Sequence, residues 1–158
     1  MTGGSPDLLV LGVGNILLGD DGAGPALAEK LSADARWSGR AEFVDGGTQG
    51  LALLPYLSGR RAVLILDAVA LGAAPGTVHV IRDWRAFAAR RATTAHEGNA
   101  RELLAAATLI GECPETVAIV GVEPEQMRTG IGLSAAVQRG VAEAVAPASG
   151  VLAEWLDV

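Results

Sequence analysis

Short apolar runs alternate along this chain with segments in which apolar residues recur at helical spacing. Apolar runs of four to eight residues between glycine, proline and polar turns are typical of buried strands. We therefore predict strands at residues 8–13, 41–44, 62–66, 78–81 and 116–122. Helices are predicted at residues 25–31, 51–57, 84 to about 90, 99–107 and 133–156, the last with a break near 147–150. Alternating strands and helices predict an α/β fold, a three-layer α/β/α sandwich with a mostly parallel, twisted sheet.

The connection between the third and fourth predicted strands is short. Residues 68–77 hold only small and apolar residues with Pro75 and Gly76, too few for the helical crossover that joins parallel strands. Residues 78–81 are therefore expected to run antiparallel to the other strands. With 158 residues and no linker or repeat, the chain is expected to form a single domain over residues 1–158.

Composition excludes several classes of protein. The net charge is −6 with a single lysine, so the chain lacks the basic surface expected of a nucleic-acid binder. Half of the residues are apolar, but no apolar run reaches the length of about 18 residues that a membrane span needs. The first residues lack the layout of a signal peptide, and the lone Cys113 excludes a disulfide within the chain. We therefore expect a cytoplasmic protein without membrane insertion.

Acidic residues follow each of the first three predicted strands. Asp20 and Asp21 stand in the glycine loop after residues 8–13, while Asp45 and Asp67 follow the second and third strands. The carboxyl ends of parallel strands usually form the ligand site, and like charges gathered there call for a cation. For each acid a structural role stays open: Asp20 or Asp21 as a helix cap, Asp45 as a turn residue.

The two histidines have different surroundings. His79 falls within an alternating strand and is expected to be a solvated surface residue. His96 lies in an irregular loop before a helix, and its imidazole suits nickel, zinc or copper. Cys113 could pair with His96 as a nucleophile, but it precedes the fifth strand, at the wrong edge of the sheet.

Five sequence motifs resemble those of the hydrogenase maturation proteases, endopeptidases that trim the C-terminal tail from the precursor of the nickel–iron hydrogenase large subunit. They occur in the family's order from Leu8 to about Val145. The motifs are Gly12-Val13-Gly14-Asn15 with Gly19-Asp20-Asp21-Gly22-x-Gly24, Asp45-Gly46-Gly47-Thr48, Leu66-Asp67-Ala68 with Pro75-Gly76, Thr93-Thr94-x-His96 and Gly121-Val122-Glu123-Pro124.

The resemblance implies both a topology and a site. It implies strand order 2-1-3-5-4 with strand four antiparallel, metal-contacting and catalytic roles for Asp21, Asp67 and His96, and substrate recognition by Asp45, Gly46, Gly47 and Thr48. The implied metal is nickel carried by the hydrogenase precursor, for which zinc or cadmium could substitute in a crystal. Hydrolysis by a metal-activated water and by an Asp acting as general base both stay open.

A Rossmann-type nucleotide-binding protein is the alternative from another class. Gly12-x-Gly14 follows a strand, as in that motif, and Asp45 closes the second strand. However, Leu17 stands where the third glycine belongs, and Asp45 lies 33 residues after Gly12 instead of about 20.

Overall fold

The computed structural model describes residues 6–89 and 99–158. A five-stranded sheet in the order β2-β1-β3-β5-β4 forms its centre. The strands are β1 (Leu8–Val13), β2 (Glu42–Gly47), β3 (Ala62–Ala68), β4 (Val78–Ile81) and β5 (Thr116–Val122). All neighbouring pairs are parallel except β4 and β5. The expected order and the antiparallel fourth strand are confirmed.

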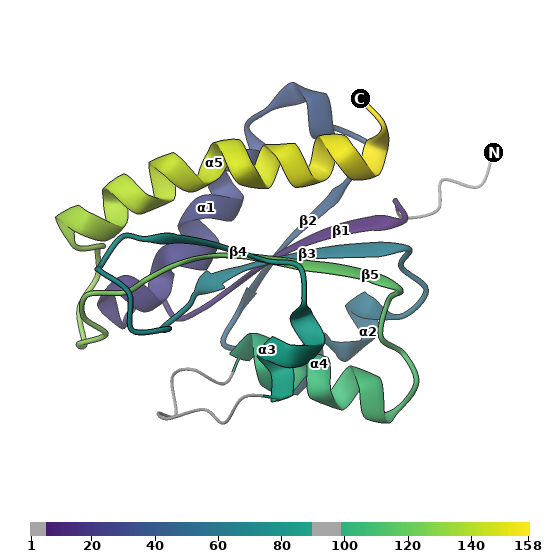
Figure 1. Ribbon diagram of the computed structural model, residues 1–158, viewed down its shortest axis with the longest axis horizontal. Helices are drawn as coiled ribbons and strands as arrows, with labels where there is room; N and C mark the ends of the chain where they lie inside the picture. The colour runs from purple at the N-terminus through teal and green to yellow at the C-terminus, as the bar shows by residue number, and fades with distance from the viewer. Residues whose placement is uncertain (1–5, 90–98) are drawn as a thin grey trace.

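Helices cover both faces of the sheet, with α1 and α5 on one side and α2, α3 and α4 on the other (Figure 1). The α-helices are α1 (Ala23–Ser32), α2 (Leu54–Leu57), α3 (Trp84–Ala89), α4 (Asn99–Leu109) and α5 (Ala135–Leu156). Three 3₁₀ turns, η1 (Gly19–Gly22), η2 (Ala35–Trp37) and η3 (Gly50–Leu53), stand in the connections. This is the predicted three-layer arrangement.

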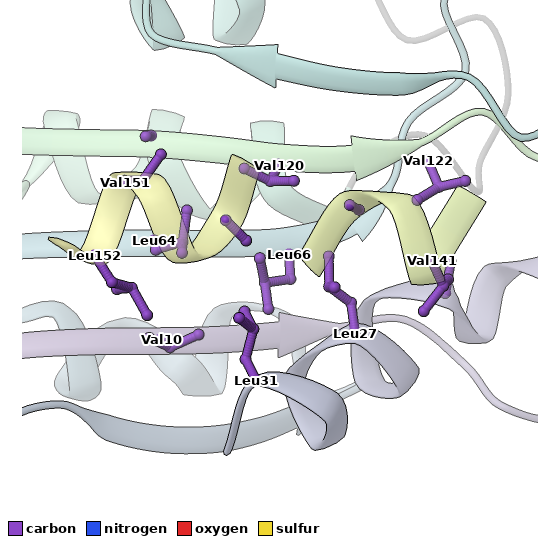
Figure 2. Packing of buried hydrophobic residues seen from close by; sticks show 14 of the residues in the cluster. Val10, Leu27, Leu31, Leu64, Leu66, Val120, Val122, Val141, Val151 and Leu152 are labelled. Atoms are coloured by element: carbon purple, nitrogen blue, oxygen red, sulfur yellow. The ribbon is translucent and has the colours of Figure 1, made fainter. Parts of the chain in front are cut away.

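Alternate residues of each central strand serve the two cores. Leu64 and Leu66 of β3 pack with α1 and α5, where Leu27 and Val141 meet them (Figure 2). Ile65, the residue between, packs in the opposite core with α2, α3 and α4. Because side chains of a strand alternate between the two faces, a residue's parity decides which helical layer it meets.

The predicted break in the last helix is wrong, because α5 runs without interruption through Pro147. A proline inside a helix removes one backbone hydrogen bond and crowds the preceding turn. On both sides of Pro147, however, Ala144, Ala148 and Val151 are buried against the sheet. This packing keeps the helix continuous.

Within the described ranges, no helix combines the length and the apolar character needed to cross a membrane.

Candidate functional site

Asp21 and Asp67 are buried acids at the carboxyl end of the central strands. Asp21, in η1, is 3% exposed, and Asp67, near the end of β3, is 6% exposed. The Asn15 backbone N–H donates to Asp21 Oδ2 at 2.7 Å, which folds the loop after β1 around this carboxylate. At Gly14, φ is 135° and a Cβ would lie 2.0 Å from the Asp21 carbonyl oxygen. The loop therefore requires glycine there.

The surroundings of Asp67 oppose ionisation of its carboxyl group. Burial raises the pKa of Asp67 well above its usual value of 3.8, and the charge of Asp21 raises it further. The backbone N–H groups of Ala68 and Ala100 and the positive charge of Arg101 act in the other direction without cancelling the effect of burial. Because the charge of Asp21 opposes the ionisation of Asp67, a cation beside the two acids would favour the ionised form of Asp67.

Arg101 is a component of this site that the sequence reasoning missed. It is 6% exposed at the start of α4, and its guanidinium carbon lies 4.4 Å from the centroid of the Phe87 ring. Burial dominates the raised pKa of Asp67, but the charge of Arg101 partly offsets it. In the sequence Arg101 stands among ordinary helix-forming residues, so nothing distinguished it from a surface arginine.

Asp20 has a structural task, unlike its neighbour Asp21. It is fully buried, and its Oδ2 accepts from the Glu125 and Gln126 N–H groups and the Ser134 hydroxyl, each at 2.9 Å. Its Oδ1 accepts from the Ser134 N–H at 2.7 Å. Burial opposes ionisation, yet these hydrogen bonds outweigh it and leave the pKa of Asp20 below 3.8. Asp20 therefore ties η1 to the loop before α5, a partner that the expected helix-cap role did not include.

The sequence predicts that Asp20 and Asp21, Asp45 and Asp67 gather around one point. Asp21 and Asp67 do lie together, but the prediction is wrong for Asp20, which is bound to the loop before α5, and for Asp45. Asp45 and Leu66 both pair with Gly12, so they lie at one level of the sheet and on one face. Asp67 is one residue further along β3 and therefore points to the opposite face. Accordingly, no group of three or more His, Cys, Asp or Glu side chains that could hold a metal occurs in residues 6–89 and 99–158.

His96 lies outside the described residues, so its expected place beside Asp21 and Asp67 stays a prediction. The segment Asp45-Gly46-Gly47-Thr48 is described. Asp45 is exposed and its Oδ1 accepts from the Gly47 N–H at 3.0 Å. The pairing register shifts after Gly12, so that Val13 pairs with Gly47. This shift is a β-bulge in which Gly46 is the extra residue of the edge strand β2. Such bulges are common next to functional sites.

The expectation that His79 is a solvated surface residue is wrong. Its side chain is 14% exposed, and Nε2 lies 3.5 Å from Glu123 Oε1. His79 pairs with Gly121 on β5. Because glycine has no side chain, the imidazole has room to lie over this strand. Glu123 Oε1 also accepts from the N–H groups of Leu71 and Ala73 at 2.9 and 2.7 Å. Glu123, which the sequence offered only as part of the motif Gly121-Val122-Glu123-Pro124, thereby holds the loop that follows β3.

Cys113 precedes β5 and is partly buried. Burial raises the pKa of its thiol, which disfavours the thiolate that a nucleophile needs. This environment agrees with the expectation that Cys113 is not the nucleophile.

Several known proteins that resemble this chain in sequence or in fold are hydrogenase maturation proteases. The family profile "Hydrogenase maturation protease" matches residues 25–150. The hydrogenase expression/formation protein HupM of Azotobacter chroococcum is 35% identical over 157 residues, which covers 98% of this chain and 75% of that protein. The hydrogenase 2 maturation protease of Escherichia coli is 37% identical over 133 residues, with 83% and 81% covered.

Solved structures agree. The hydrogenase maturating endopeptidase HybD of Escherichia coli superposes with a TM-score of 0.80 at 33% identity, covering 93% of this chain and 92% of that one. The [NiFe] hydrogenase maturation protease HybD of Thermococcus kodakarensis gives 0.69 at 25% identity, covering 91% and 97%. This chain therefore belongs to the hydrogenase maturation proteases and is an endopeptidase of hydrogenase maturation.

Proposed function

We propose that this endopeptidase removes the C-terminal tail of the precursor of a [NiFe] hydrogenase large subunit, and that it acts on the nickel-loaded form. The observation that carries the proposal is the pair of buried acids, Asp21 and Asp67, at the carboxyl end of the sheet. The pKa of Asp67 is raised first by burial and then by the charge of Asp21, and the charge of Arg101 offsets this only in part, so a further positive charge beside these acids would be favourable. Nickel carried by the substrate supplies such a charge.

The roles within the site follow from the residues. Asp21 and Asp67 provide carboxylate oxygens, and His96 provides an imidazole, to complete the coordination of the substrate's nickel. His96 precedes Ala100 by four residues, a length of chain that spans at most about 14 Å. The N–H of Ala100 bonds to Asp67, so this length of chain permits His96 to contribute to the same site. Docking of the metal then holds the scissile segment in place for hydrolysis.

The segment Asp45-Gly46-Gly47-Thr48 is proposed to contact the substrate's peptide chain beside this site. It stands at the edge strand β2 with Asp45 exposed. The Gly14 N–H donates to the Gly47 carbonyl at 3.0 Å, which joins this segment to the loop that carries Asp21. A peptide bound along β2 would therefore lead to the buried acids.

The test is processing of purified precursor by Asp21→Asn, Asp67→Asn and His96→Ala. Wild-type protein should remove the tail from nickel-loaded precursor and leave nickel-free precursor intact. Each variant should process at least about 100-fold more slowly, because the two Asp→Asn changes remove a carboxylate charge that attracts the metal and His96→Ala removes the imidazole donor. Mass spectrometry of the precursor measures the tail directly.

The exposed Asp157 offers the control, because Asp157→Asn makes the same chemical change outside the site. Full processing by one of the three site variants would remove that residue from its role. Failure of wild-type protein to process loaded precursor would contradict the proposed function itself.

A further inference from the structure

A groove lies on the α1 side of the sheet, away from the face to which Asp67 points. Its volume of about 530 Å³ falls within the range of about 300–1,000 Å³ in which proteins bind small ligands. Residues of α1, of the end of β2 and of the loop before α5 line it. They include Pro25, Ala26, Glu29, Phe43, Asp45 and Ile131.

The loop that forms one wall of the groove is fixed in place. Gly130 exchanges backbone hydrogen bonds with the loop before η1, donating to the Leu17 carbonyl at 2.8 Å and accepting from the Gly19 N–H at 2.9 Å. Asp20 holds the same loop at Ser134. A groove that exists before binding spares the cost of ordering its walls.

Large apolar side chains stand in solvent at this wall. Ile131 is 83% exposed and Ile16 is 56% exposed, and both line the groove. Leu17, whose carbonyl accepts from the Gly130 N–H, is 53% exposed. Grouped apolar side chains in solvent mark a binding surface more often than a neutral one.

The groove is acidic as well as apolar. Among its lining residues, all within the described part of the chain, the charged ones are Glu29 and Asp45, and both side chains are exposed. No lysine or arginine of that lining offsets them. A complementary ligand carries apolar side chains together with a positive charge.

The groove also reaches the loop of the candidate active site. Gly22, which follows Asp21 directly, lines the groove, as does Asp45 at its β2 end. A peptide lying in the groove would therefore continue toward the buried acids. A second copy of this chain is a less suitable occupant of the groove, because dimerisation would not require the groove to lead to the buried acids.

We propose that this groove binds the C-terminal tail of the precursor as an extended segment, with apolar side chains against Ile131 and Phe43 and a basic side chain toward Glu29 and Asp45. The inference rests on the proposed function and names the part of the substrate that the groove recognises. The groove then selects the tail, whereas the buried acids position the bond to be cut.

The first experiment measures processing kinetics of nickel-loaded precursor by Ile131→Asp and Glu29→Lys. Each should raise KM about tenfold and leave kcat within about twofold, because the groove contributes binding and lies apart from the reacting bond. The proposal requires a basic residue in the precursor's tail; replacing this residue by Glu should restore a low KM to Glu29→Lys and raise KM for wild-type protein.

Two matched variants on other surfaces serve as controls. Leu109→Asp changes an apolar residue that is 87% exposed, and Glu143→Lys reverses a charge on the exposed face of α5. Both should keep wild-type KM. If Ile131→Asp and Glu29→Lys keep wild-type kinetics while Asp67→Asn processes slowly as expected, the groove proposal is overturned and the proposed function stands.

The second experiment requires no cleavage. Ile131→Cys in a Cys113→Ser background carries a benzophenone maleimide and is irradiated with a synthetic, fluorescein-labelled tail peptide. Crosslinking to this peptide is expected, whereas Leu109→Cys should give none. Crosslinks to a second copy of the chain, or none to the peptide, would overturn the inference. Peptide crosslinking without processing of loaded precursor would instead locate the failure in the proposed function.

Discussion

At the residue scale, the adjacent acids Asp20 and Asp21 have different surroundings and therefore different roles. Asp20 accepts hydrogen bonds from Glu125, Gln126 and Ser134, whereas Asp21 is held by the Asn15 N–H beside Asp67. The carboxylate of Asp20 thereby joins η1 to the loop before α5 and has a structural role. The carboxylate of Asp21 lies close enough to Asp67 to oppose its ionisation, and it belongs to the proposed site for the substrate's metal.

Asp20→Asn should destabilise the protein at neutral pH by about 3 kcal/mol, since hydrogen bonds to a charged group each contribute about 1.5–3 kcal/mol. Burial is the largest single effect on the pKa of Asp20 and raises it. The hydrogen bonds together outweigh burial and lower the folded-state pKa below 3.8. The ionised Asp20 therefore stabilises the fold above pH 3.8, and this contribution disappears as the pH falls through the lowered pKa.

Urea unfolding of wild type and Asp20→Asn at pH 7, 5 and 3 measures the difference in free energy of unfolding. The gap should be full at pH 7 and 5 and smaller at pH 3. Asp7→Asn, at an exposed position, should leave stability within about 0.5 kcal/mol of wild type. A gap that is equal at all three values would contradict the assigned role.

At the element scale, α1 lies unusually close to the ends of β1 and β3. A Cβ at Gly24 would lie 2.2 Å from the Val13 carbonyl oxygen and 2.4 Å from that of Leu66. Because both contacts are with strand backbone, neither can move aside cheaply. Glycine at this position allows the helix that follows Asp21 to pack next to the strand that carries Asp67.

Gly24→Ala should therefore lower stability by about 1–3 kcal/mol through overpacking, although alanine favours helices over glycine by about 1 kcal/mol. Gly150→Ala in α5 is the matched comparison, because a Cβ there meets nothing within 4 Å. It should raise stability by about 0.5–1 kcal/mol. Thermal and urea unfolding measure both, and a stabilising Gly24→Ala would refute the close approach.

At the scale of the whole molecule, one sheet joins two apolar cores. Leu64 and Ile65 are adjacent in β3 and both fully buried, but they belong to opposite cores. Since β3 lies at the centre of the sheet order, neither core can open without disturbing the strand that they share. We therefore expect both apolar cores to unfold together, in one transition.

Leu64→Ala and Ile65→Ala should each cost about 2–5 kcal/mol, and each variant should unfold in a single transition. Calorimetry compared with unfolding followed by circular dichroism checks the coincidence. Val80→Ala, on the edge strand and 44% exposed, should cost little. Separate transitions for the two variants would show that the cores unfold independently.

The helices and strands, and much of their arrangement, can be predicted from the order of residues alone. Apolar runs located the strands, because a strand covered on both faces needs no polar positions, and the short connection after Asp67 required β4 to reverse direction. The motifs around Asp21 and Asp67 indicated the family and both buried acids. These features depend on neighbours in the chain, which a sequence displays directly.

Strand register and the packing of distant segments could be known only from the folded structure. The pairing of Asp45 and Leu66 with Gly12 placed Asp45 on the face opposite Asp67, and a shift of one residue would have reversed this. Burial of α5 on both sides of Pro147 kept that helix intact. Strand register and helix packing depend on contacts between residues far apart in the chain. Local sequence patterns therefore do not predict them.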